Sequence, residues 1–335
     1  MHRWTAHTWH GLYNLPTCQA FLQENLPREG LRLSFILHGI MALAALDAAL
    51  LAPREDHALV RRYKRAALEY YTRASAEFRD VMKSAVVTRD TLYLLSMFGN
   101  IAGFFNLAIS DDDNNGSGDG FAAKSAIDRV HDSFVMFLGS IHTAAMNWTW
   151  FFGGATSARL AVEEYYPRLE YMELIDVDTM AAIQRLSTVC RAIRLRPTGD
   201  PALDSDGQGP ISYDVWSYRI AVGQTKYCFA EHVVGRIKGF MVNLPTRCVC
   251  GPEIADGLRT REPMAMFILL YWGVLLHGCA GDPWLWWAGT IGRDVVVETS
   301  EILARSPAFE LEDVREGIAW ARKQVGLEAM AQVAG

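Results

Sequence analysis

The chain has 335 residues, half of them apolar and about a fifth charged, with a formal net charge of -6 and a pI of about 5.9. This composition supports a folded core rather than disorder. The acidic balance disfavours a dedicated nucleic-acid-binding protein, which would carry a basic surface, so we expect no direct binding of nucleic acid.

The six cysteines are scattered and lack zinc-ligand spacing, since the two closest are separated by a single residue. We expect buried free thiols in a reducing compartment rather than disulfides or a metal site. The segment Met1–Gly11 has neither an apolar signal core nor an Arg-rich transit pattern. These features predict a cytoplasmic protein. The cysteines are Cys18, Cys190, Cys228, Cys248, Cys250 and Cys279.

The longest apolar segment is Ser34–Leu51, and it is long enough to cross a membrane. It contains His38 and Asp47, and the rest of the chain is amphipathic. A buried helix is therefore the better interpretation, and we expect no membrane span.

Apolar residues at helical spacing predict a second helix over 56–83 and a third from Thr88 to about Ile109. The basic residues of the second helix have the spacing of a solvated flank rather than of a nuclear localisation signal. They are Arg61, Arg62, Lys64 and Arg65.

Two polar, glycine-containing segments, at about 110–122 and 196–210, predict flexible loops. The first superficially resembles a calcium loop, but Lys124 and Ser125 stand where that loop needs its distal glutamate. We therefore expect a mobile surface loop there and no calcium site.

The remaining pattern is helical, with no convincing strand and no internal repeat. The sequence predicts an all-α protein that forms one large helical domain over 1–335. The further helices are expected at about 123–152, 176–195, 211–238, 252–259, 263–279, 284–304 and 309–323.

The most informative segment begins at Pro263 and continues through an unbroken apolar run to His277, followed closely by the tryptophans of 282–287. Polar residues occupy only its ends, and Glu262 is placed as a helix-start carboxylate. We expect a buried helix that forms the wall of an apolar pocket or a core.

Four pieces of the chain, taken in order, resemble the fungal-specific regulatory domain found downstream of Zn(II)2Cys6 DNA-binding modules, and sterol-responsive regulators in particular. They are Phe35–Asp47, Tyr63–Tyr71, Arg261–Ala265 and Trp286-Trp287. The resemblance implies a helical body with a central apolar pocket for a lipophilic small molecule. The six-cysteine zinc cluster of that family has no counterpart in this sequence, which implies a body without its DNA-reading module.

Motifs for a phosphate, a nucleophile or a metal are absent from the sequence, so we expect no cofactor and no metal. A pericyclic cyclisation needs neither, because a shaped apolar site and one hydrogen-bond donor to a carbonyl suffice. Six residues are predicted to line the substrate site, and His277 or His142 is predicted to be the catalytic donor. The six are Phe105, Trp148, Tyr271, Trp272, Trp284 and Trp287. Each of these eight side chains has core packing as its competing interpretation.

Two functions follow from these expectations. The first is a cofactor-independent pericyclase of Diels–Alder type acting on a terpenoid or polyketide in fungal secondary metabolism, with a norbornene-forming cyclase of diterpene biosynthesis as the concrete example. The second is a non-catalytic regulator that binds a sterol-like lipophile and lacks its DNA-binding domain. A pure interaction module with a filled core is a third, weaker interpretation, and an oligomer is compatible with all three.

Overall fold

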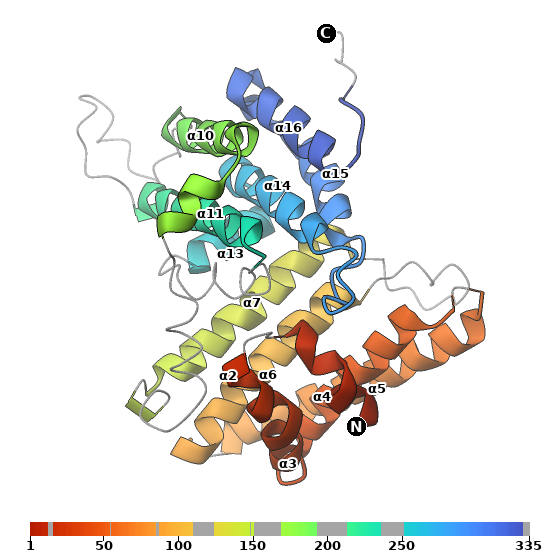
Figure 1. Cartoon of the computed structure of the whole chain (residues 1–335). Coiled ribbons are helices and arrows are strands. Elements are labelled where there is room, and N and C mark those ends of the chain that lie inside the picture. Colours follow the sequence, from red (N-terminus) through yellow and green to blue (C-terminus); the bar gives the residue numbers. More distant parts are fainter. Residues whose placement is uncertain are drawn as a thin grey trace. The chain divides into compact units, whose positions relative to one another are not determined.

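The computed structural model describes residues 1–12, 16–53, 55–84, 87–109, 124–147, 149–150, 169–192, 213–235 and 251–330. Most residues in these ranges are helical and none of them forms a strand, which confirms the all-α prediction (Figure 1). The chain divides into two compact units: unit 1 is Met1–Tyr166 with Cys279–Gly289, and unit 2 is Pro167–Gly278 with Thr290–Gly335. The single domain over 1–335 stays a prediction.

Unit 1 is built on two antiparallel helix pairs, α4 with α5 and α6 with α7, and α4 also packs against α6 (Figure 1). Short helices at the N-terminus lie against α4. The elements are α1 (His2–Ala6), η1 (Thr8–Gly11), α2 (Pro16–Ala20), the π-helical turn η2 (Phe21–Asn25), α3 (Leu26–Gly30), α4 (Ser34–Leu51), α5 (His57–Ser84), α6 (Arg89–Ala108) and α7 (Ala126–Ala145).

Local sequence explains where α6 and α7 begin and how closely they pack. Thr88 and Thr91 form a reciprocal capping box at the start of α6. Gly103 leaves the space that the ring of Phe137 occupies. Ser96 donates to the carbonyl of Ser140, and Ser140 donates to that of Ser96, so two buried hydroxyls are satisfied across the helix pair.

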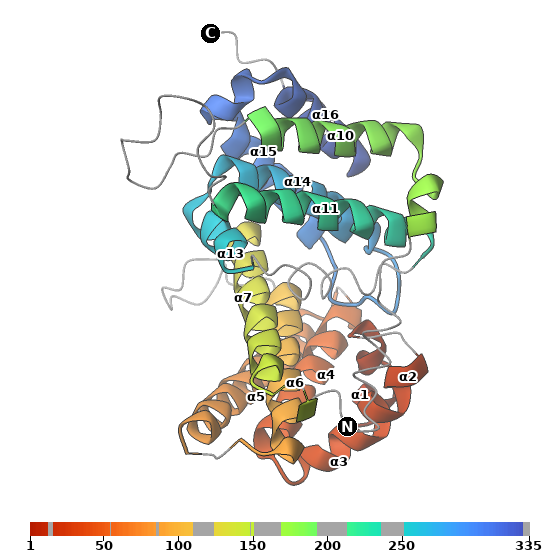
Figure 2. The ribbon, with the colours of Figure 1, turned by 90° about the vertical axis from the view of Figure 1, so that its left-hand side faces the viewer.

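Unit 2 surrounds the apolar helix α14, which packs against α15, α11, α13, α16 and α10 (Figure 2). Its start is fixed by Glu262, whose carboxylate accepts the backbone N–H of Ala265 at 3.0 Å, as expected for a helix-start acid. The elements are η3 (Leu169–Leu174), α10 (Val177–Ala192), α11 (Tyr213–Val233), α13 (Gly251–Thr260), α14 (Pro263–Gly278), α15 (Ile291–Ala304), η5 (Pro307–Glu310) and α16 (Glu312–Gln324).

The predicted helix over 284–304 is wrong in its first part, because α15 begins only at Ile291 and residues 281–290 form successive turns. The Asp282 side chain accepts the backbone N–H of Trp284 at 2.8 Å, which favours a turn over a helix. Gly281 and Gly289 bound the segment with positive φ of 93° and 42°. The tryptophans of this segment therefore do not share a helix face.

Two helices are long and apolar enough to cross a membrane by length and composition, Ser34–Leu51 and Asp90–Ala108. They are 56% and 78% buried among neighbouring helices of unit 1, as core helices also are. This is weak evidence for a span, and the expectation of none stays a prediction.

Four cysteines are buried free thiols, as expected, while Cys248 and Cys250 lie outside the described residues. The four are Cys18, Cys190, Cys228 and Cys279. Both predicted flexible loops, at about 110–122 and 196–210, also lie outside the described residues.

Candidate functional site

The predicted site residues fall into both units. Unit 1 contains Phe105, His142, Trp284 and Trp287, and unit 2 contains Tyr271, Trp272 and His277. Trp148 lies outside the described residues.

In unit 2, Tyr271 is fully buried and its hydroxyl donates to the Ala182 carbonyl at 2.8 Å. Its ring stacks on Trp320 at 5.1 Å and meets the edge of Phe267 at 5.3 Å. Burial raises the pKa of the Tyr271 phenol far above its ordinary value. The hydroxyl therefore joins α14 to α10. Because its proton is engaged in that hydrogen bond, the side chain serves as a packing group.

The other predicted residues of unit 2 occupy two different environments. Trp272 is 2% exposed within the core around α14. His277 is half-buried on the last turn of α14, where α14 and α15 cross closely. The backbone of that turn lies against Gly292 of α15.

In unit 1, two of the predicted rings are core residues and the predicted histidine lies at the surface. Phe105 is buried and stacks face to face on Tyr71, with ring centroids 4.0 Å apart. Trp287 is buried, and its indole N–H donates to the Gly11 carbonyl at 2.6 Å. His142 is exposed near the end of α7.

Among the predicted phenylalanine, tyrosine and tryptophan side chains of the described chain, Trp284 alone is substantially exposed, at 39%. Its ring lies 4.1 Å from that of His10 and 5.3 Å from that of His7, between ring centroids. His10 in turn stacks on Trp9 at 3.7 Å. These four residues, His7, Trp9, His10 and Trp284, form what we call the imidazole–indole cluster, and it extends from a buried ring to the surface of unit 1.

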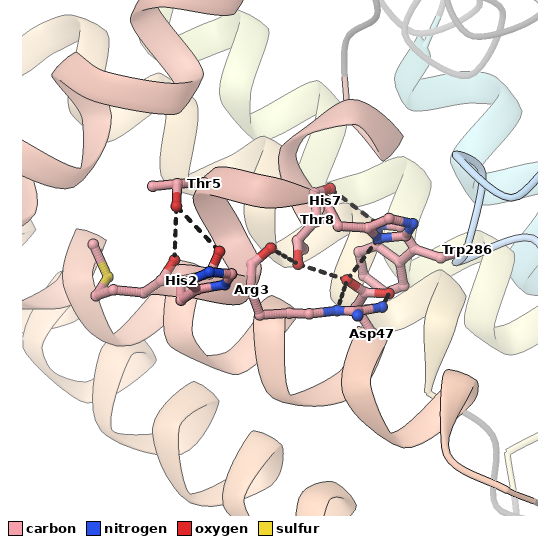
Figure 3. A network of polar contacts seen from close by, with 8 residues as sticks. His2, Arg3, Thr5, His7, Thr8, Asp47 and Trp286 are labelled. Carbon is pink, nitrogen blue, oxygen red and sulfur yellow. Dashed lines mark hydrogen bonds and ion pairs between the residues drawn. The ribbon is translucent and has the colours of Figure 1, made fainter.

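A buried carboxylate lies directly behind this cluster. Asp47 of α4 is fully buried, and Figure 3 shows three side chains from the N-terminal segment converging on it. Arg3 contacts both carboxylate oxygens, at 2.9 and 3.0 Å, and Thr8 donates its hydroxyl at 2.6 Å. His7 Nδ1 lies 3.0 Å from Asp47 Oδ2. The Asp47 carboxylate thus fixes the position of the His7 ring and ties the N-terminal segment to α4.

The segment 282–288 closes over the same N-terminal residues. Trp286 donates its indole N–H to the Thr8 carbonyl at 3.0 Å, as Trp287 does to Gly11 (Figure 3 for Trp286). Trp4 donates in the same way to the Leu22 carbonyl at 2.8 Å. Residues nearly three hundred positions apart in the chain are therefore held together by indole-to-carbonyl hydrogen bonds.

Trp9 differs from these three tryptophans. It is only 3% exposed, and its Nε1 is buried without a hydrogen-bond partner among the described residues. A buried donor without an acceptor costs about 1–3 kcal/mol. An acceptor from outside the described residues would remove that cost, which makes the Trp9 N–H a candidate contact for a bound molecule.

The sequence analysis missed His7, Trp9 and His10. The available signal was three aromatic or imidazole side chains within four residues of one another. What made it easy to overlook is that the short η1 helix gives no periodic pattern. Only the packing of the distant Trp284 shows that these rings belong to one cluster.

The half-buried imidazole of His232, at the end of α11, gives unit 2 a dependence on pH. It packs against Gly278, and its Nδ1 has no partner within the described part of the chain. Burial lowers the pKa of the imidazole below 6.5. Because the folded pKa lies below the unfolded one, the unfolded chain binds this proton first. The group is neutral in both states well above pH 6.5, and stability falls as the pH drops from 6.5 towards the folded value.

We expect the urea midpoint of the wild-type protein to fall more steeply over that pH window than the midpoint of His232→Gln, which has no proton to bind. Equilibrium unfolding at pH 7.5 and at several values below 6.5 measures the difference. Parallel curves for the two proteins would contradict the assignment of this titration to His232.

Among the described residues, no group of three or more histidine, cysteine, aspartate or glutamate side chains is placed to hold a metal ion. Comparison with known protein families, with curated proteins and with solved structures gave no match. The resemblance to the fungal regulatory domain therefore stays a prediction.

Proposed function

We propose that the protein binds a lipophilic terpenoid or polyketide intermediate at the imidazole–indole cluster. It then catalyses a Diels–Alder-type cyclisation of this intermediate without a cofactor. The observation that carries this proposal is the buried Trp9 N–H, which has no acceptor in the described chain. A carbonyl oxygen on the ligand would be its acceptor. Trp9 is the donor in this proposal, while the choice of His277 or His142 made from the sequence stays a prediction.

The cluster offers what such a ligand needs for binding. Trp9 and His10 are stacked, and Trp284 lies tilted against His10. These rings present apolar surface at a low cost in side-chain entropy. Trp284 is the exposed end of this cluster, and Trp9 is the buried end. A polyene would lie against the rings, with its carbonyl directed to the indole N–H.

The cyclisation itself asks little of the protein. The four carbons of a diene and the two of an alkene form two new carbon–carbon single bonds, three π bonds become one, and no proton or electron leaves the molecule. A hydrogen bond to a carbonyl conjugated with the alkene withdraws electron density from it and lowers the barrier. A single neutral hydrogen bond contributes about 1–1.5 kcal/mol, or roughly tenfold in rate, and the rest comes from holding the chain in its reactive fold.

The test uses purified full-length protein with no metal or nucleotide added. The probe is a linear polyene that carries a conjugated diene and a tethered α,β-unsaturated aldehyde, whose spontaneous cyclisation is measured in parallel. We expect conversion above the background. We expect Trp9→Phe, which keeps a ring but removes the N–H, to lower that excess roughly tenfold.

Trp320 provides a matched control in the other unit. Its Nε1 is also buried without a partner among the described residues, and its ring is also stacked, on Tyr271. Trp320→Phe removes the same kind of N–H and should leave conversion unchanged. If the two variants lose activity equally, the assignment to Trp9 is wrong.

The stability of the variants separates a donor from a packing group. Trp9→Phe removes a buried unsatisfied N–H and should leave the free energy of unfolding unchanged or higher. Trp287→Phe leaves the Gly11 carbonyl without its donor and should lower it by about 1–3 kcal/mol. A large loss for Trp9→Phe would show that its N–H is satisfied within the protein.

The non-catalytic interpretation uses the same binding site, but in it the bound ligand is not converted. Equilibrium dialysis of the probe measures binding independently of conversion. Binding that Trp9→Phe weakens, with conversion at the background rate, would support a lipophile-binding regulator. Absence of both binding and conversion would contradict both functions.

A further inference from the structure

Helix α5 carries an open hollow of about 380 Å³ on its outer surface, near its N-terminus. Arg61, Arg62 and Arg65 line it, with Ala58 and Ala66 as small residues between them and Glu69 at one end. All three arginines are exposed, as the sequence analysis expected of this flank. This hollow lies on unit 1 and shares no residue with the imidazole–indole cluster.

The charge of this surface is opposite to that of the chain as a whole. The sequence of α5 contains seven lysines and arginines against three acidic residues, whereas the protein has a net charge of -6. None of the three arginines of the hollow forms an ion pair with a carboxylate in the described part of the chain. The described carboxylate Glu77 on the same helix instead contacts His38 at 2.9 Å.

The spacing of these arginines opposes helix stability. Arg61 and Arg65 are separated by four positions and Arg62 and Arg65 by three, so both pairs place like charges on neighbouring turns. Such pairs each destabilise a helix by about 0.2–0.5 kcal/mol. An anion bound between the guanidinium groups would turn this repulsion into attraction.

We propose that the hollow on α5 binds an anion that carries two or more phosphate groups. Guanidinium groups match the geometry of phosphate oxygens with paired N–H donors, and they remain charged at all physiological pH values. The volume lies within the range of small-ligand sites, so it admits several phosphate groups. The carboxylate of Glu69 repels the anion at one end and confines it to the arginine side.

The test measures binding of inorganic tripolyphosphate to the full-length protein by calorimetry at low and at physiological salt. We expect saturable binding with one ligand per chain that weakens as salt screens the charges. The triple variant Arg61→Gln, Arg62→Gln and Arg65→Gln should weaken binding at least about tenfold.

Glu69 gives a second variant with the opposite expected sign. Glu69→Gln removes the repelling charge and should tighten binding severalfold, a gain that no loss of folding would produce. The circular dichroism of each variant checks that the helix content is retained.

The same helix provides a charge-matched control. Arg73, Arg79 and Lys83 are exposed on α5 outside the hollow. Replacing these three by glutamine changes the net charge by the same amount as the triple variant and should leave binding within about twofold. Equal weakening by both triple variants, or no binding by the wild-type protein, would overturn the proposal.

A further experiment distinguishes two sources of the phosphate groups, a lipid headgroup and a soluble anion. Vesicles of phosphatidylcholine with phosphatidylinositol bisphosphate present the phosphates on a lipid, and vesicles with phosphatidylserine present the same charge without phosphomonoesters. Cosedimentation with the first vesicles alone, abolished by Arg61→Gln, Arg62→Gln and Arg65→Gln, assigns a lipid headgroup. Binding of tripolyphosphate without vesicle binding assigns a soluble ligand.

Discussion

Gly292→Ala is expected to lower the free energy of unfolding of unit 2 by about 3 kcal/mol or more. A Cβ at this position would lie against the backbone N of His277, 2.6 Å from the Gly273 carbonyl oxygen and 2.6 Å from the Leu276 carbonyl carbon. All three are backbone atoms of α14, so no side-chain rotation relieves the contact. Helices α14 and α15 would have to separate, and overpacking of this kind costs about 1–3 kcal/mol even where side chains can adjust.

The intrinsic preference of helices for alanine acts against this loss but is too small to offset it, at about 1 kcal/mol. Gly223 supplies the matched control, because it also lies in a helix of unit 2 and a Cβ there would meet nothing within 4 Å. Gly223→Ala should therefore raise stability by about 0.5–1 kcal/mol.

Urea unfolding followed by circular dichroism measures both changes, provided that the slope of the transition stays the same. Two substitutions of identical chemistry are thus expected to have opposite signs. A Gly292→Ala protein as stable as Gly223→Ala would contradict the close crossing of α14 and α15.

Asp47→Ala is expected to lower the free energy of unfolding of unit 1 by about 3 kcal/mol. The substitution leaves the Arg3 guanidinium, the Thr8 hydroxyl and the His7 ring without their common acceptor. Removing one partner of a buried ion pair costs about 3–5 kcal/mol. We take the lower end because the Arg3 side chain is 37% exposed and water partly replaces the lost contact.

The exposed pair Arg32–Glu29 is the control for this change. It has a similar nitrogen-to-oxygen distance, 3.0 Å, but the Arg32 side chain is 72% exposed. Glu29→Ala should therefore cost less than about 0.5 kcal/mol. A loss for Asp47→Ala as small as that for Glu29→Ala would show that the network does not hold the N-terminal segment.

Release of that segment has its own readout. If Asp47 ties the N-terminal residues to α4, Asp47→Ala should expose the peptide bond after Arg3 to trypsin under native conditions, and the wild-type protein should resist cleavage there. The near-ultraviolet circular dichroism should weaken as well, because Trp4 lies in this segment and the Trp286 indole donates to its Thr8 carbonyl.

Much of the fold could be predicted from sequence, because helical periodicity is local. The helix over 263–279 was predicted within one residue of its end, and its apolar character on all faces correctly indicated burial on all faces. The helix over 284–304 was predicted too long because the apolar pattern continues into a segment where Asp282 and two glycines impose turns. Hydrophobicity alone does not distinguish a buried helix from a buried series of turns.

The candidate site was much less predictable. Tyr271 and Trp287 were predicted to line a substrate site, with core packing as the alternative, and the sequence could not show that their polar atoms are bonded to carbonyls. Trp9 was overlooked because a missing hydrogen bond has no sequence pattern at all. The pairing of His10 with Trp284 joins the two halves of the printed sequence, and no spacing rule reaches that far.

The amino-acid sequence by itself determined that this chain is helical, where most helices lie and which of their faces avoid water, because these properties depend on neighbours within a few turns. Only the tertiary structure decided which polar atoms are satisfied, how closely α14 and α15 cross, and that a carboxylate on α4 holds the first residues of the chain. Those features arise from contacts between distant segments, whose geometry follows from the packing of the whole unit.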